Sequence, residues 1–215
     1  MSGRGPSMVI TAGHAIYRDG VWYGGFKGVD AFYARHVEVG LQLVHDGHYD
    51  YWIPSGGPSR PAFESQTGGI SEAEGLLNYA VEHNLCAASE ERTLPEVWAR
   101  DSMENLFFGI LALHRKTGAW PSRVGVVSWS SKGLRYHLVA SGMRLGGRIV
   151  FHGVGDYPAQ ADLARACAAE ARFNAAIVDL SRTPPDYRLV DPLLRNSTEF
   201  AQKRWSRMPS AFSPD

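Results

Sequence analysis

The sequence contains little cysteine and no residue pattern typical of a metal site. Its two cysteines, Cys86 and Cys167, lie far apart, and the eight histidines form neither an HxxxH nor an HExxH pattern. Two cysteines are too few for a disulfide framework, and a reducing compartment is the simpler expectation. We therefore predict no metal ligand among these residues.

Net charge and long apolar runs are also absent. The 22 Lys and Arg side chains balance the 22 Asp and Glu side chains, so nothing implies a general attraction to nucleic acid or to an anionic membrane. No run approaches the length of a transmembrane helix, and the first residues lack the apolar stretch of a signal peptide. We expect a soluble, cytoplasmic protein that binds neither nucleic acid nor membrane.

Three widespread functional motifs are missing. The chain has neither the GxGxxG pattern of dinucleotide-binding turns nor the P-loop pattern. The stretch from Gly125 to Trp129 places Ser128 at the wrong offset for the GxSxG turn of α/β-hydrolases. These absences weaken the dinucleotide-binding, Walker-type and serine-hydrolase interpretations.

What the chain does have is an alternation of short apolar runs with longer amphipathic segments. This rhythm is typical of a parallel sheet covered by helices on both faces. We predict the α/β class, a three-layer α/β/α Rossmann-like sandwich with a mainly parallel sheet, as one domain over residues 1–215. The expected strands are 8–13, 49–54, 123–129 and 148–152, with a weak one near 92–94. The expected helices are 31–44, 71–83, 101–116 and 131–142, followed by a C-terminal helical extension over about 159–207.

Residues 14–30 are rich in glycine and aromatics and show no clear period, so a long loop or lid is expected there. In it, Trp22, Tyr23 and Phe26 would cover a ligand by stacking on a ring or facing a cation. They would equally suit the interface of a homodimer. Residues 58–70 are expected to form a second polar loop.

Ligands of open parallel sheets bind at the carboxyl ends of strands, where loops from neighbouring units meet. Polar residues follow three of the expected strands, and a polar helix start opens the segment at Asp101. Glycines let backbone N–H groups approach a ligand, and helix N-termini favour anionic groups. The candidate ligand-binding residues are Gly13, Ser55, Gly56, Gly57, Ser71, Glu72, Asp101, Ser102, Asn105, Ser128, Lys132 and Arg135, and the candidate catalytic residues are His14 and Glu104.

Each of these signals also has a purely structural interpretation. A lone histidine such as His14 is more often structural, and Lys132 with Arg135 suits a solvated helix face. Paired glycines are often plain turns. Glu72 and Glu104 would also serve as first-turn partners of the helix dipole.

Five short motifs occur in an order that matches a known family: GHAIY, PSGG, SEAEGLLNYA, ARDSMENLFFGILAL and RVGVVSWSSKGLRYHLVASG. Over roughly residues 9–155 the chain thereby resembles the domain of unknown function typified by YdcF, SanA and ElyC. The resemblance is strongest to soluble, fungal-type members. The chain differs from many bacterial members of that family, which have a histidine at the position of Lys132 and a glycine at that of His14.

The resemblance implies a Rossmann-like sandwich whose polar cleft is lined by the candidate residues named above, with S-adenosylmethionine as the cofactor. Our leading hypothesis is a small-molecule enzyme that binds S-adenosylmethionine or a related nucleoside or phosphorylated metabolite, for group transfer or lyase chemistry. One alternative is a phosphoryl or nucleotide hydrolase with Glu72, Asp101 and Glu104 around a divalent cation. Another is a ligand-binding module without turnover.

Overall fold

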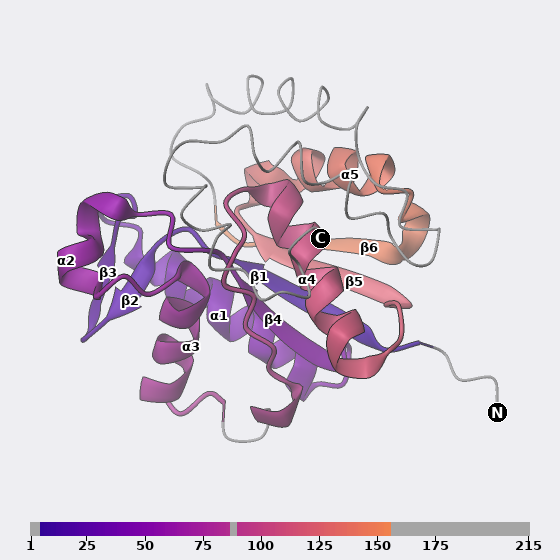
Figure 1. Ribbon diagram of the computed structural model, residues 1–215, viewed down its shortest axis with the longest axis horizontal. Coiled ribbons are helices and arrows are strands. Elements are labelled where there is room, and N and C mark those ends of the chain that lie inside the picture. The colour runs from indigo at the N-terminus through magenta and orange to yellow at the C-terminus, as the bar shows by residue number, and fades with distance from the viewer. Residues whose placement is uncertain (1–4, 87–89, 156–215) are drawn as a thin grey trace, which may run out of the picture.

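The structure is a computed structural model that describes residues 5–86 and 90–155 (Figure 1). The C-terminal helical extension expected over about 159–207, which includes Cys167, lies outside the described residues. Within the two described ranges, none of the helices has the length and apolar character needed to cross a membrane.

Four parallel strands form the central sheet. They are β1 (Ser7–Ala12), β4 (Tyr51–Ser55), β5 (Arg123–Ser128) and β6 (Ile149–Gly153), in the order β4-β1-β5-β6. All four were expected from their apolar runs, with boundaries that differ by at most two residues. The α/β fold with a parallel sheet is thus confirmed.

Helices cover both faces of the sheet, as a Rossmann-like sandwich requires. The main helices are α1 (Asp30–His45), α3 (Glu72–Glu82), α4 (Ser102–Thr117) and α5 (Gly133–Gly142), accompanied by a short α2 (Glu64–Thr67). Single 3-10 turns are η1 (Pro61–Phe63), η2 (Glu90–Arg92), η3 (Ser130–Lys132) and η4 (Gly146–Arg148). In Figure 1, α4 crosses in front of the sheet and α1 lies behind it.

The period-2 alternation of β1 divides the core into two layers. Met8 and Ile10 pack with α4 and α5 on one face, whereas Val9 packs with α1 and α3 on the other. All three side chains are fully buried. A strand buried on both faces explains why this segment is a continuous apolar run and not an alternating one.

Residues 14–30 are not the irregular loop that the sequence analysis predicted. They contain a two-stranded antiparallel hairpin, β2 (Ile16–Arg18) and β3 (Val21–Tyr23), which lies beside α2 in Figure 1. Trp22 packs with Tyr17, Tyr33 and Tyr79, at ring-centroid distances of 5.0, 5.4 and 5.5 Å. The aromatic side chain expected to cover a ligand therefore anchors the hairpin to α1 and α3.

Two smaller expectations also need correction. The polar loop at 58–70 contains the turn η1 and helix α2. The weak strand near 92–94 is replaced by two isolated parallel bridges, from Thr93 to Trp52 and from Glu96 to Ser55. Their hydrogen bonds run from Leu94 N to Trp52 O and from Glu96 N to Pro54 O, so the segment 93–96 lies along the outer edge of β4.

The strand order creates a switch point between β1 and β5. From β1 the chain passes through α1 to β4 on one side, and then continues to β5 on the other side of β1. Loops on the two sides of such a point diverge at the carboxyl ends of the strands, which leaves room for a ligand. Here Gly13 and His14 follow β1, and Trp129 follows β5.

Gly40 allows α1 to approach the sheet closely. A methyl group there would come within 2.7 Å of Trp52 Nε1 and still closer to Thr11 Oγ1, the two atoms of a buried 2.9 Å hydrogen bond. Glycine to alanine in a helix interior normally stabilises by up to about 1 kcal/mol, but overpacking a core costs about 1–3 kcal/mol. We expect Gly40→Ala to lower the free energy of unfolding measured by urea denaturation.

The matched control is Gly147→Ala, because a methyl group at Gly147 would meet nothing within 4 Å. We expect its unfolding free energy to stay within about 0.5 kcal/mol of the wild type. Equal stability of the two variants would contradict the close packing of α1.

Candidate functional site

A hydrogen bond between two predicted site residues crosses the switch point. His14 follows β1 and Ser128 ends β5, and His14 Nε2 lies 3.0 Å from Ser128 Oγ. Ser128 is fully buried, whereas His14 is partly exposed. The strand order thus brings together two residues that are 114 positions apart in the sequence.

Three cationic side chains surround the imidazole of His14. Lys132 Nζ lies 3.4 Å from His14 Nδ1, and Arg60 Nη2 donates to the backbone oxygen of His14 at 2.8 Å. Burial and then the positive charge of Lys132, with smaller contributions from His36, Arg60 and Arg135, hold the pKa of His14 well below its usual value. His14 is therefore a neutral imidazole near pH 7. We call His14, Arg60, Ser128, Lys132 and Arg135 the switch-point cluster.

A second histidine, which is buried, packs against the ring of His14. His36 of α1 lies edge-on to His14, with ring centroids 5.5 Å apart, and both rings contact Trp129. Its Nε2 lies 2.9 Å from the carbonyl oxygen of Val154. Burial lowers the pKa of His36 to about 4, against the opposing effect of the Val154 hydrogen bond, so this ring is also neutral and acts as a donor to Val154.

Arg60 connects His14 to the start of α3. Its Nε lies 3.2 Å from Glu72 Oε1, and that oxygen also accepts a hydrogen bond from Ser59 Oγ. The Glu72 side chain is only 7 % exposed, so its charge is balanced by Arg60 inside the fold. Nothing in the sequence beyond its place in a polar loop pointed to Arg60.

The glycines of the predicted loops serve close packing. A methyl group at Gly13 would lie 2.5 Å from Glu72 Cβ, and one at Gly56 would lie 2.8 Å from Glu72 Oε2. The N–H groups of Gly13 and Gly56 donate to the carbonyl oxygens of Ser55 and Glu96, and that of Gly57 donates to Ala99. These donors are used within the protein, contrary to the expectation that they face a ligand.

The first N–H groups of the helix that follows Ser71 also donate to acceptors within the protein. Ser71 and Glu74 form the expected capping box. The N–H groups of Glu72 and Ala73 donate to the carbonyl oxygens of Gly57 and Gly56. The N-terminus of α3 therefore has its first amides satisfied without a ligand.

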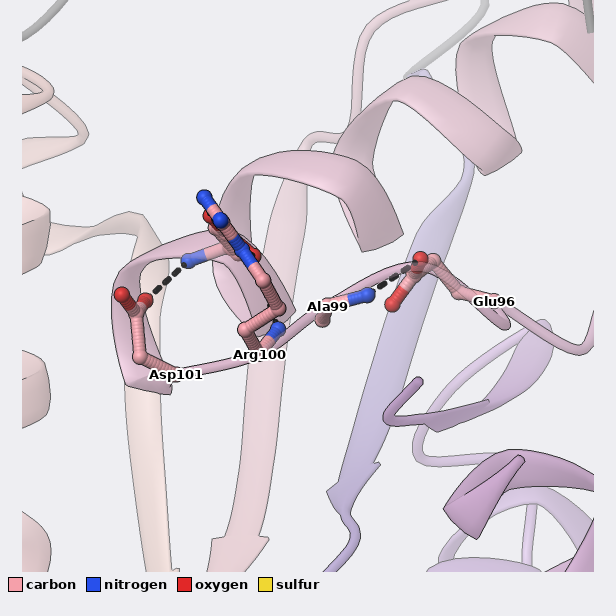
Figure 2. A network of polar contacts seen from close by, with 5 residues as sticks. Glu96, Ala99, Arg100 and Asp101 are labelled. Carbon is pink, nitrogen blue, oxygen red and sulfur yellow. Dashed lines mark hydrogen bonds and ion pairs between the residues drawn. The ribbon is translucent and has the colours of Figure 1, made fainter. Parts of the chain in front are cut away.

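Glu96 is a buried carboxylate that sequence reasoning missed. It accepts the Trp98 and Ala99 N–H groups at 2.6 and 3.0 Å, and Ser55 Oγ donates to it at 2.6 Å. Figure 2 shows Glu96 turned back onto the N–H group of Ala99. Ser55 Oγ also lies 2.9 Å from Asn105 Oδ1. Two predicted site residues, Ser55 and Asn105, therefore help to hold the segment that contains Glu96 in place.

Two further carboxylates, Asp101 and Glu104, stabilise the start of α4. Asp101 is the N-cap and accepts the Glu104 N–H group at 2.9 Å, as expected (Figure 2). Glu104 is buried and accepts the Arg100 N–H group at 2.7 Å together with the Arg100 guanidinium. Despite burial, these contacts raise the pKa of Arg100. Proton transfer by Glu104 stays a prediction, and its pairing with Arg100 favours His14 for that role.

The predicted site residues lie at or just after the ends of β1, β4 and β5 and at the starts of α3, α4 and α5, but the contacts described above do not join them into one site. His14 contacts both Ser128 and Lys132, and Arg135 Nη1 donates to Ser102 Oγ of α4 at 3.4 Å. Glu72 packs against Gly13 and Gly56, and Ser55 is hydrogen-bonded to Asn105. Glu72, Asp101 and Glu104 do not converge, and the described ranges contain no cluster of three or more His, Cys, Asp or Glu side chains that could hold a metal ion.

Comparisons with known proteins give no relative of this chain: no family model, no curated protein and no solved structure matches it. The resemblance stated above therefore stays a prediction.

We expect Glu96→Gln to destabilise the protein. A glutamine oxygen can replace Oε1, which accepts from both Trp98 and Ala99, but the amide puts an NH2 group in place of the oxygen that accepts from Ser55, and the bonds that remain lose their charged acceptor. Because a hydrogen bond to a charged group contributes about 1.5–3 kcal/mol and a neutral one about 0.5–1.5 kcal/mol, we expect a loss of about 1–3 kcal/mol. The loss should appear in the urea midpoint, and the exposed Glu91→Gln on the same segment should leave that midpoint unchanged.

We expect Arg100→Met alone to cost about 3–5 kcal/mol of unfolding free energy, because it leaves the buried charge of Glu104 without its partner. The double variant Arg100→Met/Glu104→Leu should recover much of that loss. Additive losses in the double-mutant cycle would contradict a structural coupling of the two residues.

Proposed function

We propose that the switch-point cluster binds the anionic group of a small metabolite, such as a phosphate ester or pyrophosphate, and that His14 transfers a proton in its reaction. The observation that carries this proposal is the contact of His14 with both Ser128 and Lys132 at the switch point. Ligands of open α/β sheets bind at this place.

The charge of the cluster supports an anionic ligand. Lys132, Arg60 and Arg135 all act on His14, and each is partly exposed. Among the described residues, the side chains that lower the pKa of His14 are Lys132, His36, Arg60 and Arg135, and Arg60 is also paired with Glu72. Guanidinium and ammonium groups so arranged suit phosphate and carboxylate oxygens.

S-adenosylmethionine fits this cluster only in part. Its carboxylate suits Lys132 and Arg135, but its sulfonium would add a positive charge to a site that already holds three cations. The buried carboxylates nearby, Glu72 and Glu104, are paired with Arg60 and Arg100. We therefore propose a phosphorylated metabolite first and keep S-adenosylmethionine as the second candidate.

The residues around His14 suit its role in proton transfer. Ser128 and Trp129 fix the ring, and His36 packs on it from α1. A neutral imidazole at pH 7 has a lone pair with which to act as a base. The metal-dependent hydrolase has less support, because Glu72, Asp101 and Glu104 are engaged at separate places.

We expect pyrophosphate to bind the purified protein in a calorimetric titration at low salt. Lys132→Ala should weaken this binding by about tenfold to a hundredfold, because each charge-assisted hydrogen bond contributes about 1.5–3 kcal/mol. The matched control is Lys116→Ala, which removes the same charge from the exposed last turn of α4. S-adenosylmethionine and S-adenosylhomocysteine are titrated in parallel.

Absence of heat with pyrophosphate up to about 1 mM, which corresponds to roughly 4 kcal/mol of binding, would overturn the phosphorylated ligand. Equal affinities of the Lys132→Ala and Lys116→Ala variants for pyrophosphate would show that the anion does not bind at Lys132. Tighter binding of S-adenosylmethionine than of pyrophosphate would make it the leading ligand. Binding without turnover of any phosphorylated substrate would favour a ligand-binding module.

A further inference from the structure

The contacts of His14 fix the direction of its hydrogen bonds. A charged lysine ammonium has three donors and no lone pair, so in the contact between Lys132 Nζ and His14 Nδ1 the ring nitrogen is the acceptor. A neutral imidazole carries one N–H group, which must then be on Nε2. His14 therefore donates from Nε2 to Ser128 Oγ across 3.0 Å.

This arrangement is the reverse of a catalytic serine dyad. There the histidine accepts the proton of the serine hydroxyl, and a carboxylate holds the N–H on the other ring nitrogen. Here Ser128 accepts from His14, and the other ring nitrogen faces a cation. Ser128 is also fully buried. Ser128 is thus a positioning residue for the ring and not a nucleophile.

The single lone pair of the imidazole is consequently occupied in the protein without ligand. It is directed at Lys132, and the contact is long at 3.4 Å. A phosphate or carboxylate oxygen is a far better partner for an ammonium group than an imidazole nitrogen at this distance. An anion bound at the cluster would compete for Lys132.

We propose that Lys132 is a gate on His14: an anionic ligand draws the ammonium group away from Nδ1, and the lone pair of His14 then becomes available to accept a proton. The inference rests on the proposed anion site and adds a regulation to it. His14 is inactive as a base until the ligand is present. The proton accepted by Nδ1 comes from the ligand or from water, and the imidazolium so formed keeps its Nε2–H bond to Ser128.

The surrounding charges act in the same direction. His14 faces Lys132 of η3, His36 of α1, Arg60 of the loop after β4 and Arg135 of α5, and all four lower its pKa. A bound anion acts in the opposite direction: it raises the pKa of His14 both by direct attraction and by engaging Lys132.

Sulfate is a suitable probe because it carries a constant charge between pH 5 and 8. We would follow the histidine side chains by nitrogen-15 NMR, assign His14 by its loss in His14→Asn, and use His152 as an internal reference. His152 contacts Tyr49 at 3.0 Å, and the charges that act on it come from Arg123 and His48. Calorimetry on the same samples reports whether sulfate binds.

In the wild type without sulfate, we expect His14 as the Nε2–H tautomer. Saturating sulfate should raise its pKa and leave His152 unchanged. The affinity for sulfate should then increase as the pH falls, by up to about tenfold per pH unit where one proton accompanies each anion. Lys132→Met should raise the pKa of His14 without sulfate, and sulfate should raise it less than in the wild type.

Different failures lead to different conclusions. Sulfate that binds without moving the pKa of His14 overturns the gate and leaves the anion site intact. An Nδ1–H tautomer in the wild type, or an unchanged pKa in Lys132→Met, also overturns the gate. If sulfate and pyrophosphate both fail to bind, the proposed function falls, and the gate falls with it.

Discussion

The packing of Glu72 against two glycines is the constraint on which the carboxyl edge of the sheet depends. Its side chain fills the space that a Cβ atom would need at Gly13 and at Gly56, and thereby joins the ends of β1 and β4 to the start of α3. The same carboxylate holds Arg60, which reaches the backbone of His14. Removing any of these contacts would loosen the position of His14 relative to β5.

The buried carboxylates of this edge are stabilised in two different ways. Glu72 and Glu104 are paired with arginines, whereas Glu96 is satisfied by two backbone N–H groups and a serine hydroxyl. All three are therefore fully used in holding loops and helix starts. Lys132, Arg60 and Arg135 lower the pKa of His14, and this positive potential is the electrostatic basis of the anionic ligand that we propose.

The sheet could be predicted from the sequence because β1 and β5 are continuous apolar runs, and the cap of α4 because Asp101 precedes a helical pattern. Clustering of His14 with Ser128 followed from parallel strands ending at one edge. The hairpin was missed, since its strands have three residues each and depend on tertiary packing of Trp22. Glu96 and Arg60 were missed because only long-range contacts reveal their partners, Ser55 and Glu72.

Pro54 in β4 has a consequence for how the molecule meets other chains. Its carbonyl oxygen accepts from Glu96, on the outer side of the strand. Because the N–H and C=O groups of a strand residue point to the same side, the donor that proline lacks is missing from the outer edge and not from the pairing with β1. That edge offers an interrupted row of donors, already partly occupied by the segment 93–96, and is thereby protected against strand addition and edge-to-edge aggregation.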